Sequence, residues 1–153
     1  MEFLGEDMGR CAKMRVTEKE VVFSKVAPQR VGNVDVAIVG KAKIVVANDR
    51  LAISDEGLVN AIRDAWVLVV NGDADEALVA AAHPYVTIVN GLAASDERLA
   101  EMCAAHSRGW NVEDAEGAHT QKKVLCVSKD DCIEVLFGES RENPVGLLSV
   151  ECK

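Results

Sequence analysis

Two carboxylates, Asp73 and Asp75, stand two residues apart where an apolar run of the chain ends. They belong to the turn Asn71-Gly72-Asp73-Ala74-Asp75-Glu76. Carboxylate oxygens are the ligands that a hard cation prefers, so the pair is a candidate for a metal ion or a metal-bound phosphate. The same residues are also typical of the first turn of a helix, where negative charge complements the helix dipole. The spacing leaves both interpretations open.

The acidic turn is one of three that follow the same pattern in the middle of the chain. An apolar strand runs through a polar, acidic turn into an amphipathic helix over 44–62, 67–82 and 86–106. Repetition of strand and helix predicts parallel strands, and such sheets bind ligands beyond the carboxyl ends of their strands. We therefore expect an α/β fold with a three-layer, mainly parallel sheet, helices on both faces and a candidate site at the carboxyl edge.

The remainder of the chain has a different pattern. Residues 1–16 show no steady period, which predicts a poorly anchored leader before a single domain over 17–153. Within that domain we expect strand-helix repeats to about residue 108 and a mostly extended C-terminal segment over 109–153. In that segment, 123–128 and 132–137 are expected to form a β-hairpin extension.

Local signals near the start of the domain predict a helix and a strand. Thr17 and Glu20 have the spacing of a capping box, and Val22 with Val26 marks one helical face. The almost wholly apolar run 34–39 predicts a strand that is covered on both faces.

Charge and composition limit the partners and the cellular location that we expect for the protein. The chain has 153 residues, 17 basic against 25 acidic, and a formal net charge of −8. This excess of acid argues against a nucleic-acid partner, which needs clustered lysine and arginine, and Lys122 with Lys123 is too small a cluster. The apolar runs are too short to cross a bilayer, and the acidic start is unlike a secretory peptide, so we expect no membrane partner and a cytoplasmic location. An exposed edge among the last strands would favour a homodimer.

Cysteine and tryptophan residues give weaker signals. The five cysteines include no Cys-x-x-Cys pair, so neither a disulfide framework nor a zinc ribbon is indicated. Cys103 falls on the apolar stripe of its expected helix. Trp66 and Trp110 flank strands, where packing is a more common role than ligand stacking.

From Glu20 to about Asp96 the chain resembles the archaeal GTP-dependent dephospho-CoA kinases, whose fold is similar to that of thiamine pyrophosphokinase. The resemblance lies in the order and separation of short segments. These are Lys19-Glu20-Val21-Val22, Asp35-Val36-Ala37-Ile38-Val39-Gly40-Lys41-Ala42-Lys43, Asn48-Asp49-Arg50 and Gly72-Asp73-Ala74-Asp75-Glu76-Ala77-Leu78. The chain departs from the family where Val39 replaces an aspartate and where Val89-Asn90-Gly91-Leu92 replaces a Tyr-Gly-Gln-Pro loop.

The resemblance implies phosphoryl transfer from GTP to a CoA precursor, with Mg²⁺ neutralising charge on the moving group. Asp73 and Asp75 would then act as catalytic metal ligands, and Lys41 would reach the nucleotide phosphates. The further phosphate-binding positions would be Glu20, the backbone amides of Val21 and Val22, Gly40, Lys43 and Gly72.

Each assignment has an alternative. Glu20 would serve only a capping box with Thr17, and Lys41 and Lys43 would form a solvated turn. Because two family motifs are altered, a non-catalytic relative that binds a small molecule or a protein is the second functional hypothesis.

Overall fold

The structure is a computed structural model, and it describes residues 12–17, 20–24, 26–31, 34–39, 42–47, 56–71, 76–90, 97–113, 119–127, 132–137 and 147–152. These residues form two six-stranded sheets and three helices.

One sheet is mixed and contains the strands of the expected repeats. Its order is β10-β7-β6-β5-β4-β3. The strands β5, β6, β7 and β10 run parallel to one another, whereas the β4–β5 and β3–β4 pairs are antiparallel. The bounds are β3 (Gln29–Val31), β4 (Val34–Val39), β5 (Ala42–Ala47), β6 (Val67–Asn71), β7 (Val86–Asn90) and β10 (Val124–Val127). The prediction of parallel strands with intervening helices is therefore confirmed for the middle of the chain. The expectation that both faces of 34–39 are covered holds for Val34 and Val36 on the helix side and Ala37 on the other, but it is wrong at Ile38, which is 63% exposed.

The second sheet has the order β2-β1-β11-β12-β8-β9 and is antiparallel except for the β12–β8 pair. It joins both ends of the described chain. Its bounds are β1 (Ala12–Thr17), β2 (Val21–Ser24), β8 (Trp110–Glu113), β9 (His119–Lys122), β11 (Cys132–Phe137) and β12 (Leu147–Cys152).

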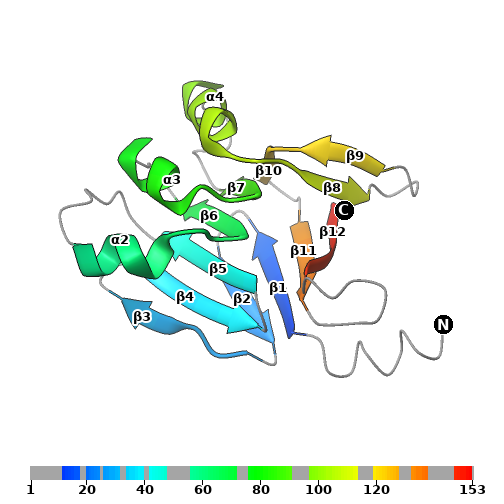
Figure 1. Cartoon of the computed structure of the whole chain (residues 1–153). Coiled ribbons are helices and arrows are strands. Elements are labelled where there is room, and N and C mark those ends of the chain that lie inside the picture. The colour runs from blue at the N-terminus through cyan, green and yellow to red at the C-terminus, as the bar shows by residue number, and fades with distance from the viewer. Residues whose placement is uncertain are drawn as a thin grey trace.

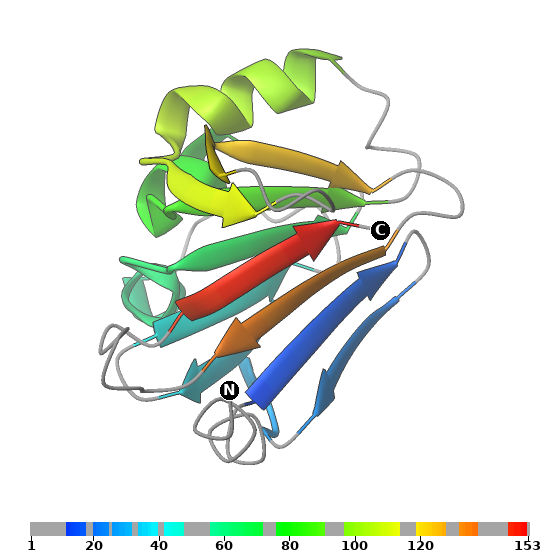
Figure 2. The ribbon, with the colours of Figure 1, turned by 90° about the vertical axis from the view of Figure 1, so that its right-hand side faces the viewer.

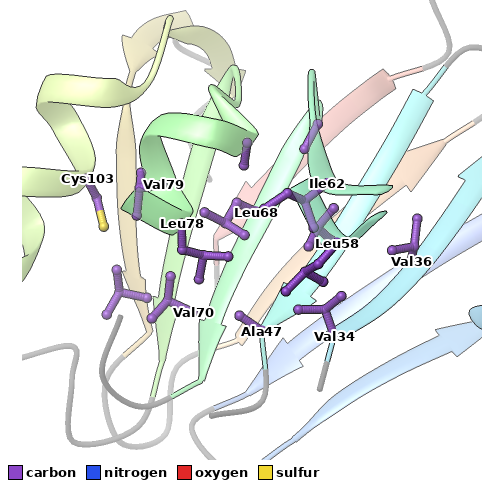
Figure 3. Packing of buried hydrophobic residues seen from close by; sticks show 14 of the residues in the cluster. Val34, Val36, Ala47, Leu58, Ile62, Leu68, Val70, Leu78, Val79 and Cys103 are labelled. Carbon is purple, nitrogen blue, oxygen red and sulfur yellow. The ribbon is translucent and has the colours of Figure 1, made fainter. Parts of the chain in front are cut away.

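All three described helices cover one face of the mixed sheet (Figure 1). They are α2 (Glu56–Ile62), α3 (Glu76–Ala82) and α4 (Glu97–His106). Their buried side chains recur at the spacing of one helical face, as Leu58 and Ile62 in α2 and Leu99 and Cys103 in α4. Figure 3 shows residues of all three helices directed toward Val34, Ala47, Leu68 and Val70 of the strands.

The other face of the mixed sheet is covered by the second sheet, which faces the viewer in Figure 2. The expected three-layer α/β fold with helices on both faces is therefore wrong, and the layers are helices, mixed sheet and second sheet. The reason lies in the alternation of apolar residues. Met14 and Val16 of β1 alternate with Lys13, Arg15 and Thr17 and are buried between the sheets, as are Ile133 and Val135 on either side of Glu134 in β11.

Long-range pairing overrides two local expectations. Met14 and Val16 are fully buried, so Ala12–Thr17 is not part of a poorly anchored leader. The segments 123–128 and 132–137 do not form a hairpin, because β10 pairs with β7 in one sheet and β11 pairs with β1 in the other.

The Thr17–Glu20 spacing marks a turn between β1 and β2 rather than a helix start. The amide of Glu20 donates to Thr17 Oγ1 at 3.2 Å, and the amide of Thr17 donates to the Glu20 carbonyl at 2.9 Å. Within the described residues, no helix combines the length and apolar character that crossing a membrane requires.

Candidate functional site

The residues expected to form the site fall partly outside the described chain. Five of them lie outside the described residues, namely Gly40, Lys41, Gly72, Asp73 and Asp75. Their convergence stays a prediction.

The described strands that flank these residues place them at opposite ends of the parallel strands, one group at the amino ends and the other at the carboxyl ends. Val39 pairs with Ala42, next to the edge at which β6 begins. Asn71 ends β6 at the other edge, beside Asn90.

Glu20, Val21 and Val22 do not surround a helix N-terminus. Glu20 is exposed in the turn, and Val21 and Val22 belong to β2, which forms the edge of the second sheet in the described chain. Val21 packs against the apolar core between the sheets, and Val22 is 45% exposed. The expected cradle of helix amides at this position is therefore wrong. No group of three or more potential metal ligands is found among the residues that the structure describes.

Lys43 is fixed at the amino edge of the parallel strands. It lies in β5 one residue before the Ile44–Val67 pair. Its Nζ donates to the carbonyl of Arg63, just past the end of α2, at 2.9 Å. Lys43 is therefore a held, half-buried cation rather than a wholly solvated turn residue.

Backbone hydrogen bonds extend the parallel sheet beyond Lys43 and bring aromatic residues beside it. The amide of Trp66 donates to the Lys43 carbonyl at 2.7 Å, and the amide of Tyr85 donates to the Trp66 carbonyl at 3.0 Å. Lys43, Trp66 and Tyr85 are consequently cross-strand neighbours in one row at the amino edge.

The segment after α4 continues this row. The amide of Arg108 donates to the Pro84 carbonyl and the amide of Gly109 to the Tyr85 carbonyl, both at 2.7 Å. Gly109 has φ +104°, a backbone conformation that favours glycine at this crossing. Trp110 follows and starts β8.

The three aromatic residues of the row form one cluster. The ring centroids of Trp66 and Tyr85 are 5.5 Å apart, those of Tyr85 and Trp110 are 5.0 Å apart, and both pairs meet edge to face. All three side chains are half-buried. Trp66 and Trp110 pack against the core between the sheets, so the packing role expected from the sequence is confirmed. Each of the three residues nevertheless keeps a part of its surface exposed to solvent.

Arg108 is held over this cluster by several contacts. Its guanidinium carbon lies 3.8 Å from the centroid of the Tyr85 ring. Its Nε donates to the His83 carbonyl at 3.0 Å and its Nη2 to the Ala65 carbonyl at 3.4 Å. These contacts fix the guanidinium, and Nη1 has no hydrogen-bond partner in the described part of the chain. The side chain is nevertheless exposed.

Further cations lie on segments that adjoin the aromatic cluster. Lys122 pairs with Trp110 in the β8–β9 register, and the Lys123 carbonyl accepts a hydrogen bond from the Thr87 amide. Within the described chain, no ion pair involves the side chains of Arg63, Arg108, Lys122 or Lys123. We call this region the amino-edge surface and define it by Lys43, Arg63, Trp66, Tyr85, Arg108, Trp110, Lys122 and Lys123.

Charge is unevenly distributed along the helices. Glu56, Glu76 and Glu97 occupy the first turns of α2, α3 and α4. Arg63 and Arg108 follow the ends of α2 and α4, where a positive charge complements the helix dipole. Both cations thus lie toward the amino edge, where the exposed Asp64 follows Arg63 in the sequence.

The amino-edge surface was missed because ligand sites of parallel sheets were sought at the carboxyl ends. A signal for it exists in the sequence. Lys43, Trp66, Tyr85 and Lys123 each stand immediately before an apolar strand run, and parallel strands bring such positions to one edge.

No family model, curated protein or solved structure matches the chain. The resemblance to the dephospho-CoA kinases accordingly stays an expectation.

Proposed function

We propose that this protein is a binding module that recognises an anionic partner at the amino-edge surface. The observation that carries the proposal is the exposed guanidinium of Arg108, which is held on the Tyr85 ring and by two carbonyls and forms no ion pair with a carboxylate of the described residues. A held guanidinium loses little conformational entropy when it binds, and its free N–H groups suit the paired oxygens of a phosphate or carboxylate.

The neighbouring side chains support the same chemistry. Lys122 and Lys123 add point charges without ion-pair partners in the described chain, and Trp66 and Trp110 are half-buried aromatic residues. A set of fixed donors, mobile cations and aromatic surface favours a ligand that carries several negative charges. We place the module in the cytoplasm, since no paired cysteine spacing indicates an oxidising compartment.

Arg108 also has a structural role, because its side chain satisfies the carbonyls of Ala65 and His83. A test of binding must therefore separate affinity from stability. Arg108→Gln removes the charge and keeps donors for one carbonyl, while Lys13→Gln removes an exposed charge on the second sheet, where Lys13 lies 3.6 Å from Glu134.

The test is a titration with pyrophosphate and with poly-glutamate, followed by tryptophan fluorescence. Both tryptophans of the chain lie in the amino-edge surface, so the signal reports on this region. We expect binding of at least one anion by the unchanged protein and by Lys13→Gln, and at least tenfold weaker binding by Arg108→Gln. Equal affinity of all three proteins, or no binding of either anion, would contradict the proposal.

Phosphoryl transfer from GTP to a CoA precursor is a separate proposal that rests on the sequence resemblance alone. Its test is incubation with GTP, Mg²⁺ and dephospho-CoA and detection of CoA. The proposal predicts turnover that Asp73→Asn abolishes and that Glu101→Gln, at an exposed position of α4, leaves intact. Absence of product across pH and divalent metals would reject it.

A further inference from the structure

We infer that the anionic partner of the amino-edge surface is single-stranded nucleic acid. The inference rests on the proposed binding function and specifies its ligand. It is carried by one juxtaposition: Arg108 lies on the Tyr85 ring and Lys122 pairs with Trp110, and neither cation forms an ion pair among the described residues.

The cations of this surface come from positions far apart in the sequence. Arg63 follows α2, Arg108 follows α4, Lys122 ends β9 and Lys123 precedes β10. A polyanion interacts with the local arrangement of charge, whereas the net charge of −8 averages over the whole chain. Glu56 and Glu97 stand at the starts of α2 and α4, whereas Arg63 and Arg108 follow their ends; Glu76 lies 3.5 Å from His106, near the end of α4.

The aromatic cluster provides the second element of such a surface. Single-strand binding proteins combine cations that follow the backbone with aromatic rings on which bases stack, and stacking tolerates any base sequence. Trp66, Tyr85 and Trp110 are all partly exposed, and Arg108 already stacks on Tyr85. Unpaired bases are accessible to these rings only in a single strand, because a duplex keeps its bases stacked on one another.

Other anions make less use of the surface. Pyrophosphate would engage Arg108 and a lysine but not the tryptophan rings. An acidic peptide would satisfy the cations, but its carboxylates give no reason for an aromatic cluster beside them. Of these three anions, only a single strand uses both the charges and the rings.

The experiment titrates the full chain with a twelve-nucleotide oligo-dT, monitored by tryptophan fluorescence at 50 and 200 mM salt. Parallel titrations use a duplex of the same length, poly-glutamate and pyrophosphate. We expect oligo-dT to quench the fluorescence and to bind more tightly than the other three. Three phosphate contacts correspond to a salt slope of about −2, so the fourfold increase in salt should weaken binding by roughly 20-fold.

Matched variants locate the contact. The double substitution Lys122→Gln and Lys123→Gln should weaken oligo-dT binding and reduce the salt slope, because both lysines are exposed and outside the core. Lys13→Gln should change neither. Trp110→Leu should weaken binding and remove part of the quenching. A far-UV circular dichroism spectrum and a melting curve for each variant show whether it is folded.

The outcomes separate the inference from the proposed function. Binding of pyrophosphate or poly-glutamate without oligo-dT would overturn the inference and leave the binding module standing. Equal affinity for duplex and single strand, or binding without a change in tryptophan fluorescence, would also overturn it. Absence of binding to every anion would overturn both.

Discussion

Arg108 and Tyr85 join the end of α4 to the start of β7, with the guanidinium carbon 3.8 Å from the ring centroid. The backbone fixes the same relationship, since the amide of Gly109 donates to the Tyr85 carbonyl at 2.7 Å. The contact therefore holds a helix end against the sheet and presents a charged group to solvent at the same place.

Replacement of Arg108 by lysine tests which property of the side chain matters. Arg108→Lys keeps the charge but loses the planar fork, the contact with the ring and at least one of the two carbonyl hydrogen bonds. We expect the free energy of unfolding to fall by about 1 kcal/mol, as for an exposed cation–π contact. Urea denaturation followed by circular dichroism measures this, and an unchanged midpoint would show that the ring contact is not stabilising.

Asn90 connects the two sheets at the opposite edge. The residue is fully buried, its Nδ2 donates to the Thr17 carbonyl at 2.9 Å, and its Oδ1 has no partner within the described residues. Asn90→Leu removes the unsatisfied acceptor but also takes a hydrogen-bond donor from the Thr17 carbonyl, so we expect a loss of about 1 kcal/mol. Asn90→Asp buries a carboxyl group and should cost about 3 kcal/mol at pH 7.

The cost of Asn90→Asp should depend on pH. Burial raises the pKa of the introduced carboxyl group above its ordinary value, so stability is greatest below that value and falls as pH rises. Urea midpoints of both variants at pH 5 and pH 8 measure the effect. A pH-independent difference between them would mean that the introduced carboxyl group reaches solvent.

Cys103 makes stability sensitive to alkaline pH. Burial between α4 and the mixed sheet, together with a smaller effect of Cys126, raises the pKa of the Cys103 thiol to about 11. Stability gained by keeping this thiol neutral is full below the ordinary thiol pKa and is lost as pH rises through about 11. Between pH 8 and 11, the unchanged protein should therefore lose more stability than Cys103→Ala, as measured by thermal melting. Parallel losses in both proteins would argue against this assignment.

Two isoleucines on adjacent strands provide a matched test of the core between the sheets. Ile44 on β5 is fully buried, whereas Ile38 on β4 is 63% exposed. Ile44→Ala should cost about 3 kcal/mol through lost burial and a residual cavity, and Ile38→Ala should cost less than about 0.5 kcal/mol. Similar urea midpoints for the two variants would show that the second sheet does not cover β5 as described.

Local periodicity was a reliable guide where an element buries its own repeated face. Leu58 with Ile62 and Leu99 with Cys103 recur at helical spacing, and α2 and α4 form there because their stripes match the sheet below. The apolar runs of β6 and β7 likewise predicted buried parallel strands.

Local signals failed where two conformations satisfy them equally well. The hydroxyl of Thr17 accepts a hydrogen bond from the Glu20 amide in a turn, as it would from a residue in the first turn of a helix. The choice was made by β1, whose Thr17 pairs with Cys132 more than a hundred residues away. Periodicity within a window contains no information about such a partner.

The sequence by itself therefore determined the helices and the parallel strands, because their apolar spacing is a property of neighbouring residues. Only the tertiary structure decided that a second sheet, rather than helices, covers the mixed sheet. It also decided that Lys43, Trp66, Tyr85 and Arg108 meet at the amino edge. That meeting depends on the register between strands, which is fixed by the burial of side chains far apart in the chain.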